Sequence, residues 1–148
     1  MPGSEDWTRA YALVSKIEID IANLTNKVLC EKKGADWFIH CVPQKIREKC
    51  EIRRVREDSG IPVTAYIDLV DYKLIWKENW DVFGRLLAHI ESSPSKSRSL
   101  QFIQEINPIR NLVSHPTKRL GAGLSKPTIE QLTKLECARE VVATLLRL

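Results

Sequence analysis

Residues 7–28, WTRAYALVSKIEIDIANLTNKV, carry an apolar residue at every third or fourth position. The apolar positions are Trp7, Ala10, Val14, Ile17, Ile21, Leu24 and Val28. Because an α-helix turns once in about 3.6 residues, this spacing places these side chains on one face. The pattern predicts a long amphipathic helix over residues 5–32, which Gly34 would end.

The same helical spacing recurs along most of the chain, and no segment alternates convincingly with the period of two that indicates a strand. Further helices are predicted from Pro43 to about residue 57, from Asp68 to about residue 89, from near Ser97 onward, and over residues 128–147. Asp68 is positioned to cap the third helix, and Thr128 with Gln131 has the spacing of a capping box. Asn79 is a candidate break. We expect an all-α fold, a bundle of about five helices forming a single domain over residues 1–148.

The remaining segments are polar or irregular. DWFIHC (36–41) is ambiguous between a short helix and an extended piece. ESSPSKSRS (91–99) is predicted to be a polar loop, and PTKRLGAGLSKP (116–127) a basic loop containing glycine. Pro108 lies inside the fourth predicted helix and is expected to interrupt it, because proline lacks an amide hydrogen.

The composition fits a folded domain of moderate charge. Hydrophobic residues make up 43% of the 148 residues, which is enough for a core, and the formal net charge is +4. This excess permits an anionic partner without requiring one. No run approaches the roughly 18 apolar residues of a membrane span. The start, MPGSEDWTRAY, lacks the basic-then-apolar order of a secretory signal. We therefore expect a cytoplasmic protein, nuclear if the cell is eukaryotic, with no membrane partner.

The four cysteines give no sign of a cofactor site. Cys30, Cys41, Cys50 and Cys137 are irregularly spaced and form no C-x-x-C pair. We interpret them as reduced, mostly buried thiols; the alternative is a zinc site that they share with His40. No metal and no cofactor are expected, since nothing resembles a phosphate-binding loop, a dinucleotide fingerprint or a Ser-His-Asp set.

A polar cluster closes the fourth predicted helix, in INPIRNLVSHP (106–116). Arg110 offers a planar, permanently charged donor fork for a phosphate, and His115 can take or give a proton near pH 7. Asn111 carries both a donor and an acceptor. Asn111 and His115 share a helix face, whereas Arg110 and His115 diverge by about 140°. They can converge only because arginine is long and Pro116 forces the helix to end.

The cluster also has a plainly structural interpretation. An arginine and a histidine near the carboxyl end of a helix are favoured by the helix dipole. Spacing alone therefore leaves both interpretations of Arg110 and His115 open.

RNLVSH (110–115), preceded by FIQEINPI (102–109), resembles the signature of HEPN domains (higher eukaryote and prokaryote nucleotide-binding), an arginine, a polar residue and then a histidine. VPQKIREKC (42–50) and AYIDLVDYKLIWKENWDVFG (65–84) are similar to the branch found in nuclear messenger-RNA surveillance endonucleases and bacterial defence proteins. The resemblance covers residues 37–116, over half the chain.

The resemblance implies a HEPN-like helical bundle that forms a homodimer, with two motif helices facing each other across a cleft. Active members are metal-independent endoribonucleases that cleave single-stranded RNA through attack of the 2′-hydroxyl on the adjacent phosphate. His115 would then be the acid/base, Arg110 the phosphate-binding group and Asn111 the positioning group. The alternative is a non-catalytic HEPN module that dimerises or binds a nucleotide or a protein. A regulatory protein or antitoxin would be a further partner.

Two basic groups are predicted to bind RNA. Lys118, Arg119 and Lys126 follow His115 along the chain, and Lys45, Lys49 and Arg53 form a stripe on the second predicted helix. A solvated helix face is the alternative for the stripe. The tryptophans Trp37, Trp76 and Trp80 are predicted to lie in the core, since the last two continue an apolar stripe.

Overall fold

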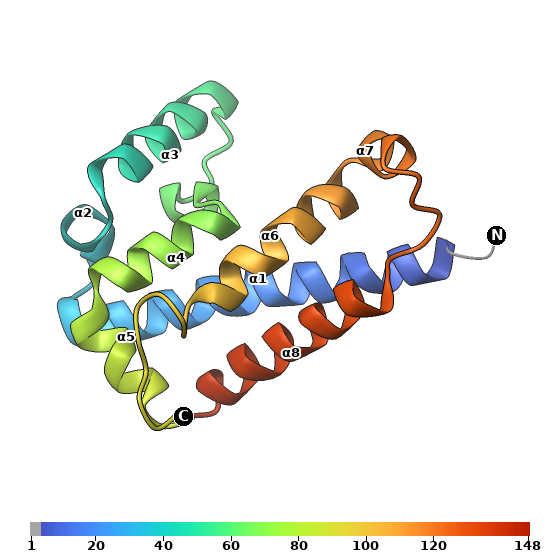
Figure 1. The fold of residues 1–148 in the computed structure, drawn as a ribbon. Coiled ribbons are helices and arrows are strands. Elements are labelled where there is room, and N and C mark those ends of the chain that lie inside the picture. Colours follow the sequence, from blue (N-terminus) through green and yellow to red (C-terminus); the bar gives the residue numbers. More distant parts are fainter. Residues whose placement is uncertain (1–3) are drawn as a thin grey trace. The chain divides into compact units, whose positions relative to one another are not determined.

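The computed structural model describes residues 4–148, and within them it contains eight α-helices, one 3-10 helix and no strand. The helices are α1 (Ser4–Lys33), α2 (Trp37–Cys41), α3 (Gln44–Glu57), η1 (Val63–Tyr66), α4 (Leu69–Glu78), α5 (Trp80–Leu87), α6 (Gln101–Ser114), α7 (Pro116–Gly121) and α8 (Ile129–Leu146) (Figure 1). The prediction of an all-α fold is confirmed. None of these helices is long and apolar enough to cross a membrane.

The predicted number of about five helices was too low. The ambiguous segment 36–41 forms the short helix α2, and the third predicted helix is divided into α4 and α5. Asn79 makes that division: its backbone leaves the helical region, and its side-chain amide donates to the carbonyls of Ile75 at 2.7 Å and Cys41 at 2.9 Å. The candidate break at Asn79 is therefore confirmed, and the side-chain hydrogen bonds to Ile75 and Cys41 hold the chain at this point.

The chain divides into two compact units. One unit combines the chain up to Leu24 with Gln101–Leu148, and the other is Thr25–Leu100. Both draw on α1, whose earlier part belongs to the first unit and whose last turns belong to the second. The prediction of one domain over residues 1–148 stays a prediction.

The first unit is built from the earlier part of α1 together with α6, α7 and α8. The apolar stripe predicted on α1 is buried, with Ile17 and Ile21 fully enclosed, and α6 packs on α8. The buried positions of α6 and α8 are Ile103, Ile106, Ile109, Val113, Leu135, Ala138, Val142 and Leu145. At the start of α8 the predicted capping box is present, since Thr128 and Gln131 exchange hydrogen bonds of 3.0 and 2.9 Å.

The second unit has a core of aromatic side chains. Trp76 is fully buried, stacks on Phe83 with ring centroids 4.6 Å apart, and donates its indole N–H to the Thr25 hydroxyl at 2.8 Å. Trp37 is also buried, as predicted, whereas Trp80 is only half-buried. The Trp80 ring covers Gly84 so closely that a Cβ there would lie 2.9 Å from it.

Helix α6 runs through Pro108 without a break, so the expected interruption was wrong. A proline inside a helix removes one backbone hydrogen bond and crowds the preceding turn. Here the helix buries apolar side chains on both sides of that position, Ile106 and Ile109 among them. This burial holds α6 together as far as Ser114, where the polar motif lies.

Candidate active site

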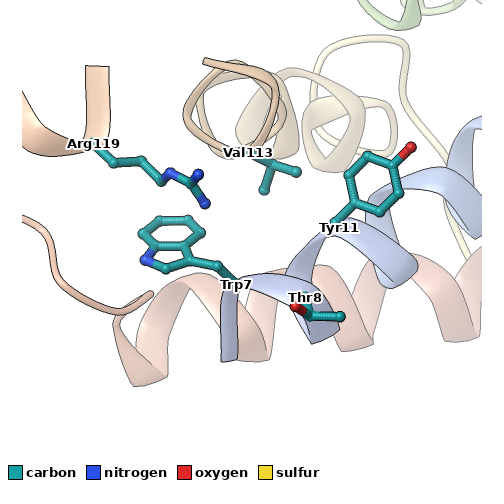
Figure 2. Close-up of a pocket in the computed structure, with 5 residues that line it drawn as sticks. All are labelled: Trp7, Thr8, Tyr11, Val113 and Arg119. Carbon is teal, nitrogen blue, oxygen red and sulfur yellow. The ribbon is translucent and has the colours of Figure 1, made fainter. Parts of the chain in front are cut away.

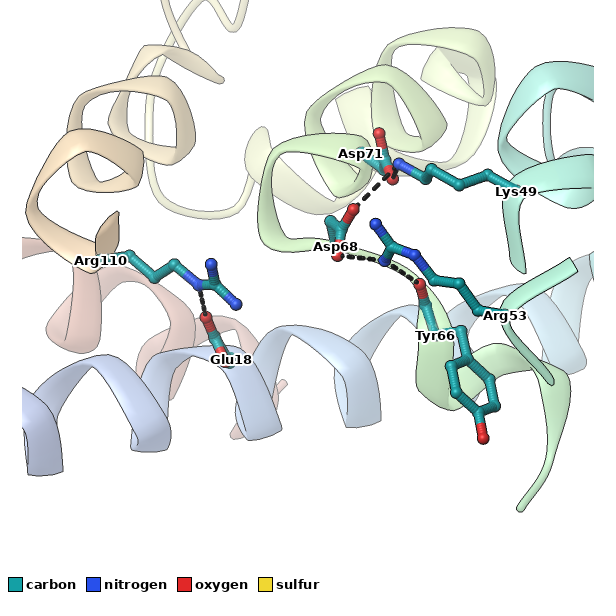
Figure 3. A network of polar contacts seen from close by, with 7 residues as sticks. All are labelled: Glu18, Lys49, Arg53, Tyr66, Asp68, Asp71 and Arg110. Carbon is teal, nitrogen blue, oxygen red and sulfur yellow. Dashed lines mark hydrogen bonds and ion pairs between the residues drawn. The ribbon is translucent and has the colours of Figure 1, made fainter. Parts of the chain in front are cut away.

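Arg110 lies near the carboxyl end of α6 and is tied to α1. Its Nε–H donates a hydrogen bond of 3.0 Å to the Glu18 carboxylate (Figure 3). The two side chains are 35% and 37% exposed. A guanidinium has five N–H donors, and this bond uses one of them. Within residues 4–148 no further hydrogen bond from Arg110 is found, so its terminal amino groups can receive a ligand.

His115 occupies the junction between α6 and α7. Helix α6 ends at Ser114, and His115 leaves the helical region with φ −129° and ψ 87°. Its amide donates to the Asn111 carbonyl at 3.1 Å, while its own carbonyl accepts from the Lys118 amide at 2.9 Å. The expected helix end before Pro116 is thus confirmed. The His115 side chain is exposed to solvent, where an imidazole can exchange protons with a substrate.

The structure does not join the three motif side chains to one another. Asn111 is half-buried beside Arg110 on α6. Among residues 4–148, neither Asn111 nor His115 makes a side-chain hydrogen bond, and Arg110 has no bond to either. This agrees with the divergence of Arg110 and His115 around an ideal helix. A ligand that contacts both would have to bridge them.

Two of the three basic residues after His115 lie on a helix rather than in a loop. The prediction of a loop over 116–127 missed α7, which starts with Pro116 at its first position and buries none of its six residues. Lys118 and Arg119 lie in α7, whereas Lys126 is exposed in the link to α8. The Arg119 guanidinium lies 4.7 Å from the centroid of the Trp7 ring, the geometry of a cation–π contact.

An open pocket of about 330 Å³ surrounds this contact (Figure 2). It is lined by Trp7, Thr8, Tyr11, Val113 and Arg119, from α1, α6 and α7. We call it the aromatic pocket. The sequence pattern does not predict this pocket, because Trp7 belongs to the apolar stripe of α1 and Tyr11 lies outside the stripe. The spacing of Trp7 and Tyr11 could have indicated the pocket, because residues four positions apart on a helix are neighbours on its surface.

The aromatic pocket and the Arg110–Glu18 pair lie along the same two helices. Val113 is three residues after Arg110, so the two share a side of α6. Tyr11 and Glu18 are seven residues apart and share a side of α1, about 10 Å from each other along its axis. The pocket therefore continues the surface on which Arg110 is held.

Two residues of the basic stripe of α3, Lys49 and Arg53, are paired with carboxylates within their own unit (Figure 3). Lys49 pairs with Asp71 and, at 3.0 Å, with Asp68. Arg53 donates to the other oxygen of Asp68 at 2.8 Å and to the Tyr66 carbonyl at 3.4 Å. These four charged residues join α3 to the start of α4. The predicted role of Lys49 and Arg53 in RNA binding gains no support from this arrangement, whereas Lys45 is exposed in the first turn of α3.

Protonation at this cluster follows the ion pairs. Burial raises the pKa of Asp68, but the hydrogen bonds and charges of Arg53 and Lys49 outweigh it, and the pKa lies below its usual value. Burial lowers the pKa of Lys49, but Asp71 and Asp68 outweigh it, and that pKa is raised. Asp68 does stand at the N-cap position of α4, as expected, but its side chain makes no capping hydrogen bond. Its carboxylate faces Arg53 and Lys49 instead.

The cysteines are all free thiols. Cys50 is buried, Cys137 is exposed, and Cys30 and Cys41 are half-buried, so fewer are enclosed than expected. Burial raises the pKa of the Cys41 and Cys50 thiols. Over residues 4–148, no group of three His, Cys, Asp or Glu side chains is placed to hold a metal ion.

Comparison with known proteins gave no relative from which the function of this site can be inferred. No protein-family model, no curated protein and no solved structure matches the chain. The function of the site is therefore inferred from its residues and their chemistry.

Proposed function

We propose that the chain is a metal-independent endoribonuclease of the HEPN type, which cleaves single-stranded RNA at a composite site in a homodimer. One observation carries the proposal. Arg110 and His115 are both accessible to solvent at the carboxyl end of α6. The hydrogen bond from Arg110 to Glu18 uses only Nε–H, so the terminal amino groups can donate to a phosphate. A cation that binds phosphate and a side chain that can take and give a proton are what RNA cleavage needs in the absence of a metal.

The chemistry assigns a role to each side chain. The 2′-oxygen of the RNA attacks the adjacent phosphorus, and the 2′-hydroxyl proton passes to a neutral imidazole of His115. The bond from phosphorus to the 5′-oxygen breaks, and a protonated imidazole returns a proton to that oxygen. The products are a 2′,3′-cyclic phosphate and a 5′-hydroxyl. Arg110 stabilises the negative charge that develops on the phosphate oxygens, and Asn111 orients the strand.

A second copy of the chain supplies what one copy lacks. The reaction uses one base and one acid, and each chain offers a single histidine in the motif. Within one chain Arg110 and His115 make no contact. Two motif helices facing each other would bring two imidazoles and two guanidinium groups to one linkage, which is the geometry that the HEPN resemblance implies. Such an enzyme acts where RNA is accessible, in the cytoplasm or in a eukaryotic nucleus, under the control of a regulatory partner.

End-group mapping tests this proposal. Purified chain is incubated with a 5′-labelled single-stranded RNA, with and without EDTA, and the ends of the fragments are identified. We expect cyclic phosphate and 5′-hydroxyl ends in both samples, and no cut where a single 2′-deoxynucleotide replaces the nucleotide 5′ to the linkage. Cleavage that persists at the deoxy position, or that needs an added divalent metal, contradicts the mechanism.

A binding module is the second candidate. The observation that favours it is the Glu18 carboxylate on Arg110, because a paired arginine is a weaker phosphate ligand than a free one. In that case the folded dimer would bind RNA, a nucleotide or a protein and would leave the RNA intact in the same experiment.

A further inference from the structure

We infer that the aromatic pocket binds one base of the single-stranded RNA whose phosphate contacts Arg110. This inference rests on the proposed function and adds to it a base-binding subsite built by Trp7, Tyr11, Val113 and Arg119. None of these residues takes part in proton transfer. Their role is to hold the strand while Arg110 and His115 act on a linkage nearby.

Trp7 and Arg119 form one wall of the pocket. Trp7 is 7% exposed, and its indole N–H donates to the Ser125 carbonyl at 3.1 Å, which sets the plane of the ring. Arg119 stacks above that plane, as Figure 2 shows. No carboxylate forms an ion pair with Arg119 within residues 4–148. A guanidinium that lies over an aromatic ring and lacks an anionic partner keeps N–H donors for an acceptor, such as a phosphate or a base carbonyl.

Tyr11 forms the opposite wall, and its ring is open to solvent. It is 61% exposed, although the pocket lies directly beside it. An aromatic ring at the rim of a cationic pocket is the arrangement with which proteins stack single-stranded bases. Val113 closes the floor between the walls with an apolar surface.

Size and charge favour a nucleotide over the side chains of a protein partner. A volume of about 330 Å³ is at the low end of the roughly 300–1,000 Å³ of ligand pockets, so it suits a single base rather than a longer segment. Lys118 and Lys126 are exposed close by in sequence and add positive charge to that of Arg119. A polyanion is the partner that these cations attract.

The test measures strand affinity in the uncleaved state. A labelled single-stranded RNA of about 12 nucleotides is titrated by fluorescence anisotropy with His115→Ala protein, which carries either no further change or Tyr11→Ala. We expect Tyr11→Ala to weaken binding by about 5- to 150-fold, the loss of one stacked base. Tyr11→Phe keeps the ring and should bind within about twofold of the parent. Ile19→Ala is the matched control, since Ile19 is 57% exposed on the same helix outside the pocket.

Abasic nucleotides separate stacking from a general effect on the surface. Removing the base at one position of the strand should weaken binding to the His115→Ala parent and have no effect on the Tyr11→Ala form, because the two changes delete the same contact. Equal affinities of Tyr11→Ala and Ile19→Ala, or the same abasic profile in both forms, overturn the inference. So does a lower molecular mass of Tyr11→Ala in light scattering with unchanged RNA affinity, which would show a protein partner in the pocket.

The two proposals fail separately. If the unsubstituted chain cleaves RNA and Tyr11→Ala has no effect on binding, the base-binding subsite is wrong and the nuclease stands. If Tyr11 governs binding but no RNA is cut, the nuclease is wrong and the subsite stands. A folded chain that binds no single-stranded RNA overturns both.

Discussion

Arg110 and Glu18 form a hydrogen-bonded ion pair of 3.0 Å between α6 and α1, with about a third of each side chain exposed. The cation proposed to bind phosphate is therefore already opposite a carboxylate. The pair positions the guanidinium, yet its negative charge also repels an incoming phosphate. Because both groups face water, the electrostatic effect is modest and depends on salt.

Glu18→Gln separates these two effects. The amide keeps a hydrogen-bond acceptor for Arg110 and removes the charge. We expect RNA affinity to rise by about 2- to 5-fold at low salt, with a smaller gain at high salt, and stability to change by less than about 1 kcal/mol. Anisotropy titrations at two salt concentrations measure this, with Glu31→Gln as the exposed control on α1. Weaker binding of Glu18→Gln would show that positioning dominates.

Removing the motif side chains should abolish cleavage and spare the fold. His115→Ala is expected to reduce the rate by about 100- to 10,000-fold, the usual contribution of a general acid or base. Arg110→Ala should cost about 100- to 1,000-fold and weaken RNA binding as well. Thermal unfolding should show only small changes, since neither side chain is buried.

The controls for that experiment are His89→Ala and Arg139→Ala, which replace exposed residues of the same type that are not part of the motif. Both should cleave like the parent. Full activity in either motif variant means that the residue has been wrongly assigned.

The ion cluster around Asp68 predicts a stability that depends on pH. The folded-state pKa of Asp68 is lowered, so its contribution is present above the ordinary carboxyl value of about 3.9 and is lost as the pH falls through the folded-state value. Asp68→Asn should cost about 1 kcal/mol at pH 7, near the range of surface pairs because a third of the side chain is exposed. Urea unfolding at pH 7 and near pH 3 should show this penalty shrinking in acid. Glu78→Gln, at an exposed site, should show no such change, and a penalty that is constant with pH contradicts the assignment.

Gly84 predicts a case in which packing outweighs helix propensity. Alanine is favoured over glycine inside a helix by about 1 kcal/mol, but a Cβ at Gly84 would lie 2.9 Å from the Trp80 ring. Overpacking of this kind costs about 1–3 kcal/mol. We expect Gly84→Ala to be destabilising by about 1 kcal/mol in urea unfolding.

Gly121→Ala is the matched control, because no atom lies within 4 Å of a Cβ at that position. It should be neutral or stabilising by up to about 1 kcal/mol. Similar effects of both substitutions would mean that Trp80 moves aside without cost.

Helices that carry an apolar stripe or a capping box were predicted from the sequence. The stripe from Trp7 to Val28 predicted α1, and Thr128 with Gln131 predicted the start of α8. In contrast, α7 has six residues and buries none of them, so it leaves no apolar period to detect. Helix α6 continues through Pro108 because the apolar side chains around it are buried. The position of a proline in the sequence does not reveal this burial.

The ion pairs and the cation–π contact at the site could not be predicted, because they join segments that are distant in the sequence. The carboxylates on Lys49 and Arg53 come from Asp68 and Asp71, beyond a connector that carries no sign of the pairing. Arg119 meets Trp7 from the other end of the chain. The pattern at 110–115 predicted a polar cluster, but it gave no sign of the carboxylate of Glu18, which the fold places on Arg110.

The short helix α7 should unfold locally more often than its neighbours. It buries no side chain, and six residues are too few for a helix to be stable by itself. Its backbone amides should therefore exchange with deuterium much sooner than those of α6. The His115 carbonyl is bonded to the Lys118 amide, and Arg119 lies on the same turn of α7. Fraying of α7 would therefore loosen the His115 imidazole and the Arg119 guanidinium together. In the proposed nuclease, RNA binding through Arg119 and proton transfer through His115 would then both depend on one local unfolding step.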